Sequence, residues 1–344
     1  MHAPPLARWD AVWYRSVAVD GYRYDPASPE NNIGFYPLYP LLLRGLSAAL
    51  PVPILWLGIG FSLACLLGAL WLAGNLFFEW GGRATAIRGL SALLLFPTSF
   101  YFASVYTESL FLLLTVSALC AARRQKWLMA GGAGFLASLT RLNGFLIAIP
   151  IAWYAWRAWR RPRREVLDAG PGPHGTRAAA LAGTALPFVG AAVYPLYLWV
   201  RFRDPLLYIH SKAVGWGMRS APLWVIATNT ARELRESVLA PARLENLSVL
   251  SQLASAVLFV WLTVRLFRRG LIAEGLYAAA TLLLLLHAST LSGMDRYVLT
   301  LFPCFFGLAA ELARRPALSF ACMLTGVTLQ VTFLHRFVHW IMVS

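Results

Sequence analysis

Long runs of apolar residues constrain the fold of this chain more than any other feature. Five of them cover residues 53–78, 109–122, 178–200, 271–286 and 318–334. A helix rises about 1.5 Å per residue, so roughly 20 apolar residues cross a hydrocarbon core of about 30 Å. Only 13% of the 344 residues are charged, whereas about a quarter are charged in an ordinary soluble domain. The mean hydropathy is +0.61. We therefore predict an all-α, multi-pass integral membrane protein.

The apolar runs predict about ten transmembrane helices. They form a single domain over residues 1–344, with no internal repeat and no separate soluble part. The predicted crossings lie near residues 54–78, 86–101, 106–122, 127–140, 144–160, 178–200, 246–265, 271–290, 297–312 and 317–335.

The basic residues predict the orientation of these helices. Of the 30 Lys and Arg, 16 lie in one set of alternate short loops, which together contain five acidic residues. The basic stretch 157–177 belongs to this set. Short loops rich in Lys and Arg stay in the cytoplasm. The segments 1–53 and 201–246 are then the two long extracytoplasmic loops. Because the charge of +15 is spread over short loops between apolar runs, it does not indicate nucleic-acid binding.

One apolar segment, residues 35–50, does not fit as a crossing. It is short, has prolines at positions 37 and 40 near its start, and contains Arg44. If it crossed the bilayer, the distribution of basic loops after it would be inverted. We interpret it as an interfacial helix within the first outer loop.

The sequence predicts no cofactor and no metal site. The four cysteines lie inside apolar runs without metal-ligand spacing. His335 and His339 are four residues apart, but no acidic residue lies between them and no third ligand is evident. There is also no phosphate-binding loop or dinucleotide fingerprint.

The first candidate site residue is Asp10. If residues 8–22 are helical, Asp10 lies on one face with Trp13 and Tyr14, and Trp9 precedes it. Aromatic rings stack on sugars, and a carboxylate can take a proton from a hydroxyl group. An interfacial aromatic belt with an acidic helix cap explains the same pattern, so both interpretations stay open.

Charged residues close to the membrane provide further candidates. Glu108 lies where an outer turn meets the next apolar run, which indicates either a functional carboxylate or an acidic residue in a first helical turn. Arg141 and Asn143 interrupt another apolar run. Arg141 has no acidic neighbour in sequence, which favours an anionic ligand such as a phosphate. The alternative is an arginine at a helix end whose side chain reaches toward water.

A last polar cluster lies between two apolar runs on the same outer side. It consists of His287, Asp295, Arg296 and Tyr297. Arg296 is a candidate phosphate ligand, and a simple loop turn explains Asp295 and Arg296 equally well.

Five stretches together resemble the PIG-V family, the GPI mannosyltransferase 2 type, in its bacterial form. They are WDAVWYRSVAVDGY (9–22), GFYPLYPLLLR (34–44), FPTSFYFASVYTESLFLLL (96–114), TRLNG (140–144) and DRYVLTLFP (295–303). Members are similar in fold to the GT-C glycosyltransferases, whose first outer loop carries an acidic catalytic residue and helices that lie on the membrane.

The resemblance implies an inverting transfer of mannose from a polyprenyl-phosphate donor to a hydroxyl group on the extracytoplasmic side. Asp10 matches the acidic position after Trp and would be the general base, with Glu108 as the next catalytic candidate. Trp9, Trp13, Tyr14 and the polar residues named above would bind substrate. Members carry a spanning helix before this motif, so the resemblance also implies a helix upstream of Met1, lost through a misassigned start or a truncation.

The implied partners are a polyprenyl-phosphate sugar, membrane lipids and an acceptor glycan or lipid, with no nucleic acid. In a bacterium the chain would lie in the plasma membrane and the acceptor would differ from a GPI precursor. Two other functions are compatible with the residues. A transporter or flippase for a lipid-linked sugar would bind the same groups but should show repeated halves. A non-catalytic subunit would not need polar residues gathered on one side.

The predicted orientation can be tested by cysteine labelling. In a cysteine-free background, Glu30→Cys and Val52→Cys should both react with a membrane-impermeant maleimide added from outside, because an interfacial helix leaves its two ends on one side. Labelling of the two positions from opposite sides would show that residues 35–50 cross the bilayer.

Overall fold

The regular secondary structure of this protein is helical. The computed structural model describes residues 4–28, 30–160, 176–217, 220–239, 245–287, 290–341 and 343, and the regular elements in these ranges are α-helices and short 3₁₀ helices. The predicted all-α class is thus confirmed. Most of the predicted basic loop, residues 161–175, lies outside the described residues.

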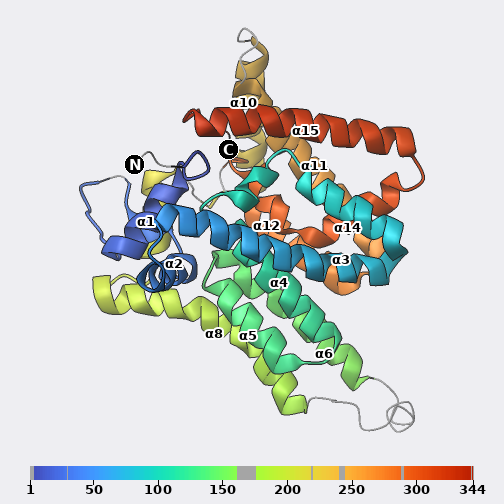
Figure 1. The fold of residues 1–344 in the computed structure, drawn as a ribbon, viewed down its shortest axis with the longest axis horizontal. Helices are drawn as coiled ribbons and strands as arrows, with labels where there is room; N and C mark the ends of the chain where they lie inside the picture. Colours follow the sequence, from blue (N-terminus) through green and yellow to red (C-terminus); the bar gives the residue numbers. More distant parts are fainter. Residues whose placement is uncertain are drawn as a thin grey trace.

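Four helices in the described ranges are long and apolar enough to cross a membrane. They are α3 (Ile54–Leu94), α8 (Arg177–Phe202), the segment Leu247–Arg268 of α11 (Glu245–Arg268) and α15 (Pro316–Val338). Shorter helices lie between them: α4 (Glu108–Arg123), α5 (Trp127–Ser138), α6 (Ala148–Trp159), α12 (Ile272–Leu285) and α14 (Phe302–Leu312). In Figure 1, α5, α6 and α8 run together toward one end of the molecule, and α15 lies across the opposite end. These helices support a membrane protein, and the number of ten crossings stays a prediction.

Helix α3 contains two of the predicted crossings in one stretch. Its backbone is helical on both sides of Gly82, which has a φ of 77°. A positive φ is readily adopted only by glycine, and here it reverses the direction of the chain. The two halves then pack on each other, since the Phe77 ring lies over Gly89. The second half ends at Leu94 and not near residue 101 as predicted, because Pro97 disfavours the helical conformation just before it.

Two other predicted crossings begin later than expected. Residues 142–147 form a 3₁₀ helix before α6, and the region before α14 consists of the short α13 (Met294–Tyr297) and a 3₁₀ turn. Proline lacks a backbone N–H and is favoured in a first helical turn. Pro303, at the start of α14, accounts for the later start of that helix.

The predicted interfacial segment forms α2 (Leu38–Ala49), a helix of 12 residues. At about 1.5 Å per residue it extends roughly 18 Å, too little to cross a bilayer. Its buried face is tied to α3 by Tyr39, whose hydroxyl group lies 2.9 Å from the Ser62 hydroxyl, while Leu41 and Leu42 are exposed. Its place at the membrane surface stays a prediction.

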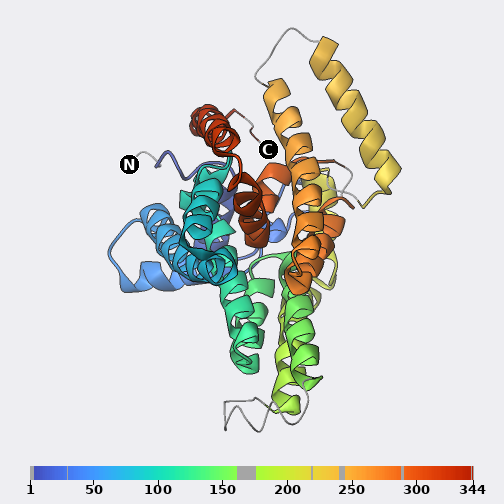
Figure 2. The same ribbon diagram turned by 90° about the vertical axis from the view of Figure 1, so that its right-hand side faces the viewer.

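The second predicted outer segment contains two further helices. They are α9 (Leu207–Gly215) and α10 (Leu223–Leu239). Figure 2 shows α10 in gold beside the orange α11, at the end of the molecule where the red α15 also lies.

Helices α5 and α8 pack closely, and small residues bring their backbones together. A Cβ atom on Gly131 would lie 2.5 Å from the carbonyl oxygen of Gly183, and one on Gly183 would lie 2.3 Å from the carbonyl oxygen of Trp127. Without a hydrophobic driving force between helices in lipid, such close backbone packing is a main source of association.

This contact can be tested with two neighbouring glycines of α5. Gly131→Ala should destabilise the protein by about 1–3 kcal/mol, because the added methyl group overlaps a backbone that cannot move aside easily. Gly132 has nothing within 4 Å of its Cβ position, so Gly132→Ala should be neutral or stabilise by up to about 1 kcal/mol through helix propensity. Thermal unfolding in detergent would measure both, and equal melting temperatures would contradict the proposed packing.

Candidate functional site

The first helix begins at Asp10, and the loop before α4 holds it in place. α1 covers Asp10–Asp20. The backbone N–H of Asp10 donates to the Tyr106 hydroxyl oxygen at 3.2 Å, and that hydroxyl group donates to the carbonyl oxygen of Arg8 at 3.2 Å. A carboxylate in a first helical turn is also favoured by the helix dipole. One hydroxyl group of this loop therefore binds the backbone on both sides of Trp9, directly before and at the start of α1.

Arg296, from α13, joins the two candidate carboxylates. Its NH1 donates to Asp10 Oδ2 at 2.7 Å, and its Nε donates to Glu108 Oε1 at 2.5 Å. The guanidinium group lies over the Tyr106 ring, with Cζ 4.5 Å from the ring centroid. Residues 286 positions apart in the sequence thus meet in one ion pair.

Arg141 completes the cluster from the turn after α5. It forms an ion pair with Glu108 Oε1, and its Nε donates to Thr107 Oγ1 at 2.9 Å. The Glu108 side chain is completely buried, and its Oε2 has no hydrogen-bond partner among the described residues. A buried charge is tolerated when it is paired and hydrogen-bonded. The result is an alternating cluster of four charges, Asp10, Arg296, Glu108 and Arg141.

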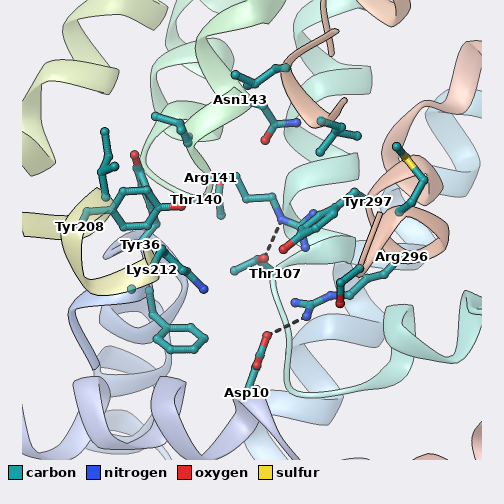
Figure 3. Close-up of a pocket in the computed structure, with 18 of the residues that line it drawn as sticks. Asp10, Tyr36, Thr107, Thr140, Arg141, Asn143, Tyr208, Lys212, Arg296 and Tyr297 are labelled. Carbon is teal, nitrogen blue, oxygen red and sulfur yellow. Dashed lines mark hydrogen bonds and ion pairs between the residues drawn. The ribbon is translucent and has the colours of Figure 1, made fainter. Parts of the chain in front are cut away.

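A cavity of about 380 Å³ opens beside this cluster. Seven of the predicted site residues line it: Asp10, Tyr14, Arg141, Asn143, His287, Arg296 and Tyr297. Apolar side chains form much of the remaining wall, among them Leu284, Leu291 and Met294. In Figure 3, Asp10 lies at the bottom of the view, with Arg296 on one side of it and Arg141 above.

The other predicted residues lie outside this lining. Glu108 accepts hydrogen bonds from Arg141 and Arg296 but does not line the cavity. The Trp9 ring packs on Trp340 at 5.5 Å between centroids, and Trp13 stacks on Phe35 at 6.1 Å. The roles predicted for Glu108, Trp9 and Trp13 stay predictions.

Asp295 also lies outside the cavity, although it neighbours Arg296. It is buried, and its Oδ2 accepts from the Ser251 hydroxyl group at 3.3 Å. Burial raises the pKa of its carboxyl group to about 7. Its predicted role in substrate binding stays a prediction.

Sequence reasoning did not assign Lys212, which lines the cavity from α9. Its ammonium nitrogen lies 4.7 Å from the Phe35 ring centroid and 4.4 Å from that of Trp216. The composition could have indicated Lys212 as a candidate, because the 30 basic residues include two lysines, Lys126 and Lys212. A single lysine in an outer segment of a chain that otherwise uses arginine is a reason to consider it.

No group of three His, Cys, Asp or Glu residues in the described ranges could hold a metal ion. The His335 and His339 rings lie 4.3 Å apart. His339 Nδ1 is 2.8 Å from the carbonyl oxygen of His335, so this ring nitrogen is engaged with the helix backbone.

The first part of the chain is similar to a known protein family. Residues 3–149 match the family described as Mannosyltransferase (PIG-V). The resemblance to the PIG-V family is confirmed over these residues, which contain four of the five similar stretches; the fifth, residues 295–303, lies outside the match. The matched segment includes Asp10, Glu108 and Arg141, whereas Lys212 and Arg296 follow it.

Two curated relatives are GPI alpha-1,6-mannosyltransferase 2 proteins. The chain is 31% identical to the one from Rattus norvegicus over 157 residues and 32% identical to the one from Mus musculus over 155 residues. Each alignment covers 41% of this chain and 30% of the relative, so the chain spans less than a third of their length. No solved structure matches the chain.

The environment of Lys212 predicts an unusual titration. Burial lowers the pKa of its ammonium group to about 8; the Asp10 carboxylate opposes this shift, and Arg296 and Arg141 add to it. Below pH 8 the amine is protonated and unreactive, and above it the neutral amine reacts with acylating reagents. Acylation followed by mass spectrometry should therefore give a rate for Lys212 that reaches half its maximum near pH 8. A midpoint near the ordinary lysine value of 10.5 would contradict the described environment.

Proposed function

We propose that this chain is a membrane mannosyltransferase that moves mannose from a polyprenyl-phosphate carrier to a hydroxyl group on the extracytoplasmic side. The observation that carries the proposal is the cluster of Asp10, Arg296, Glu108 and Arg141 at the wall of one cavity. Three of these four residues lie in the segment that matches the PIG-V family. Charged side chains near the apolar part of a membrane protein are costly and mark functional sites.

In this proposal Asp10 is the general base. Its Oδ2 is engaged by Arg296, whereas its Oδ1 has no hydrogen-bond partner among the described residues, and the side chain lines the cavity. One oxygen thus fixes the carboxylate and the other accepts the proton of the acceptor hydroxyl group. The acceptor oxygen bonds to C1 of the sugar while the bond from C1 to the phosphate oxygen breaks. Attack from the face opposite the phosphate inverts the configuration at C1.

Glu108 has a positioning role in the same proposal. Its carboxylate is completely buried and accepts from both arginines, so a hydroxyl group in the cavity does not reach it. Its hydrogen bond with Arg296 fixes the guanidinium group, and this group in turn orients Asp10. Such support of a reacting group by a surrounding layer of hydrogen bonds is what keeps a site in its productive geometry.

The cavity wall fits a lipid-linked donor. The lining combines apolar side chains, among them leucines from the end of α12 and Leu291 and Met294 near α13, with the charged side chains of Asp10, Arg141 and Arg296. A ligand with an apolar tail and a polar head matches this combination.

The test is mannosyl transfer by membranes that contain Asp10→Asn. Asparagine keeps the size and the hydrogen bond from Arg296 but cannot take the proton, so transfer from radiolabelled polyprenyl-phosphate mannose should fall about 10²- to 10⁴-fold. Asp20→Asn is a matched control on the same helix, because Asp20 is exposed and pairs with Arg23. It should leave transfer unchanged.

Near-normal transfer by Asp10→Asn would remove Asp10 from the mechanism. Carrier binding without any transfer by the unaltered chain, combined with movement of the carrier across the membrane, would support the flippase alternative and contradict the proposed enzyme.

A further inference from the structure

The charges of the two cavity arginines are already balanced. Arg141 pairs with Glu108, and Arg296 pairs with both Glu108 and Asp10. Two cations and two carboxylates thus form a neutral group. Each guanidinium group keeps further N–H donors, but the group of four charges has no net positive charge to attract an incoming anion.

Lys212 is a cation on the other side of the same cavity. In Figure 3 its side chain extends from α9 toward the space above Asp10, across from Arg296 and Arg141. Its ammonium group has no ion pair and no hydrogen bond with any described residue, and it lies over the faces of the Phe35 and Trp216 rings. An ammonium group carries three N–H donors. Within the described residues all three are therefore available to a ligand.

The backbone around Lys212 holds this side chain in place. On the preceding residue of α9, the Ser211 hydroxyl group donates to Asn31 Oδ1 at 2.7 Å, and the same oxygen accepts from the backbone N–H of Ile33. Gly34 leaves room for the lysine stem, because a Cβ atom there would lie 3.0 Å from Lys212 Cε. Residues of the first outer segment thus pack around Lys212 and restrict the position of its side chain.

We propose that Lys212 binds the phosphate of the lipid carrier, an inference that rests on the proposed function. The site takes the phosphate ester of a polyprenyl chain, with the ammonium group as the ligand of the phosphate oxygens. This places the phosphate on the wall opposite the arginines, whereas the sequence pattern had suggested the arginines themselves as its ligands.

The charge balance of the reaction agrees with this placement. A sugar phosphodiester carries one negative charge, which Lys212 neutralises. When the bond from C1 to the phosphate oxygen breaks, the phosphate gains a second negative charge and the acceptor proton passes to Asp10. A cation beside the departing oxygen stabilises the charge that develops there. A compact ammonium group can serve as a point charge for phosphate oxygens without the forked geometry of arginine.

The first experiment measures protection of Lys212 from acylation in the full chain, in phosphatidylcholine nanodiscs. Farnesyl phosphate should slow the labelling of Lys212 and leave that of Lys126 unchanged, because Lys126 is exposed at the start of α5. Farnesol, with the same tail and no charge, should give little protection. Equal protection by farnesol would overturn the inference, since the tail alone would then cover the amine.

Two further arms identify the source of the phosphate. Inorganic phosphate at the same concentration should protect less than farnesyl phosphate, because it lacks the tail. Nanodiscs that contain phosphatidylglycerol should not reproduce the protection. Protection by either one to the same degree as farnesyl phosphate would overturn the assignment to a carrier lipid.

The second experiment compares Lys212→Met with Lys212→Arg in mannosyl transfer. Removal of a charged hydrogen-bond donor should raise KM for the carrier about 10- to 100-fold in Lys212→Met, and Lys212→Arg should recover part of this loss. A Lys212→Met protein with unchanged KM and normal transfer would overturn the inference and leave the proposed enzyme intact. Protection by farnesyl phosphate in a chain that transfers no mannose would instead contradict the proposed function.

Discussion

A single carboxylate oxygen, Glu108 Oε1, holds the candidate site together. It accepts from Arg141 and Arg296, and Arg296 extends the contact to Asp10. The start of α4, the turn after α5, α13 and the start of α1 therefore all depend on one buried acceptor. Loss of one partner from a buried charge pair costs about 3–5 kcal/mol, so ion pairs tie the elements around the cavity to one another in addition to apolar packing.

The residues of this cluster were predictable from the sequence, and their pairing was not. Asp10, Glu108, Arg141 and Arg296 each interrupt or border apolar stretches, and the cost of charge near lipid makes such residues candidates wherever they occur. Arg141 has no acidic neighbour in sequence, which favoured an anionic ligand. In the structure its partner is Glu108, 33 residues away. Pairing over such distances depends on how the helices pack, and periodicity does not encode it.

The same limit applies to the aromatic residues and to the helix ends. Trp9 and Trp13 lie next to a candidate base, and this proximity in sequence suggested sugar stacking; in the structure their rings pack on Trp340 and Phe35. Apolar runs predicted the helical class correctly. They also separated the predicted crossings 54–78 and 86–101, and the reversal at Gly82 lies between them; they did not locate the helix end at Leu94.

The two sides of the cavity are held by different kinds of contact. Helices α5 and α8 touch through the backbone at Gly131 and Gly183, and Arg141 follows α5 closely in the sequence. The wall that carries Lys212 is held by side chains, through the hydrogen bond from Ser211 to Asn31 and the rings of Phe35 and Trp216. Substitutions of these side chains would therefore change the lysine wall and leave the backbone contact of α5 with α8 in place.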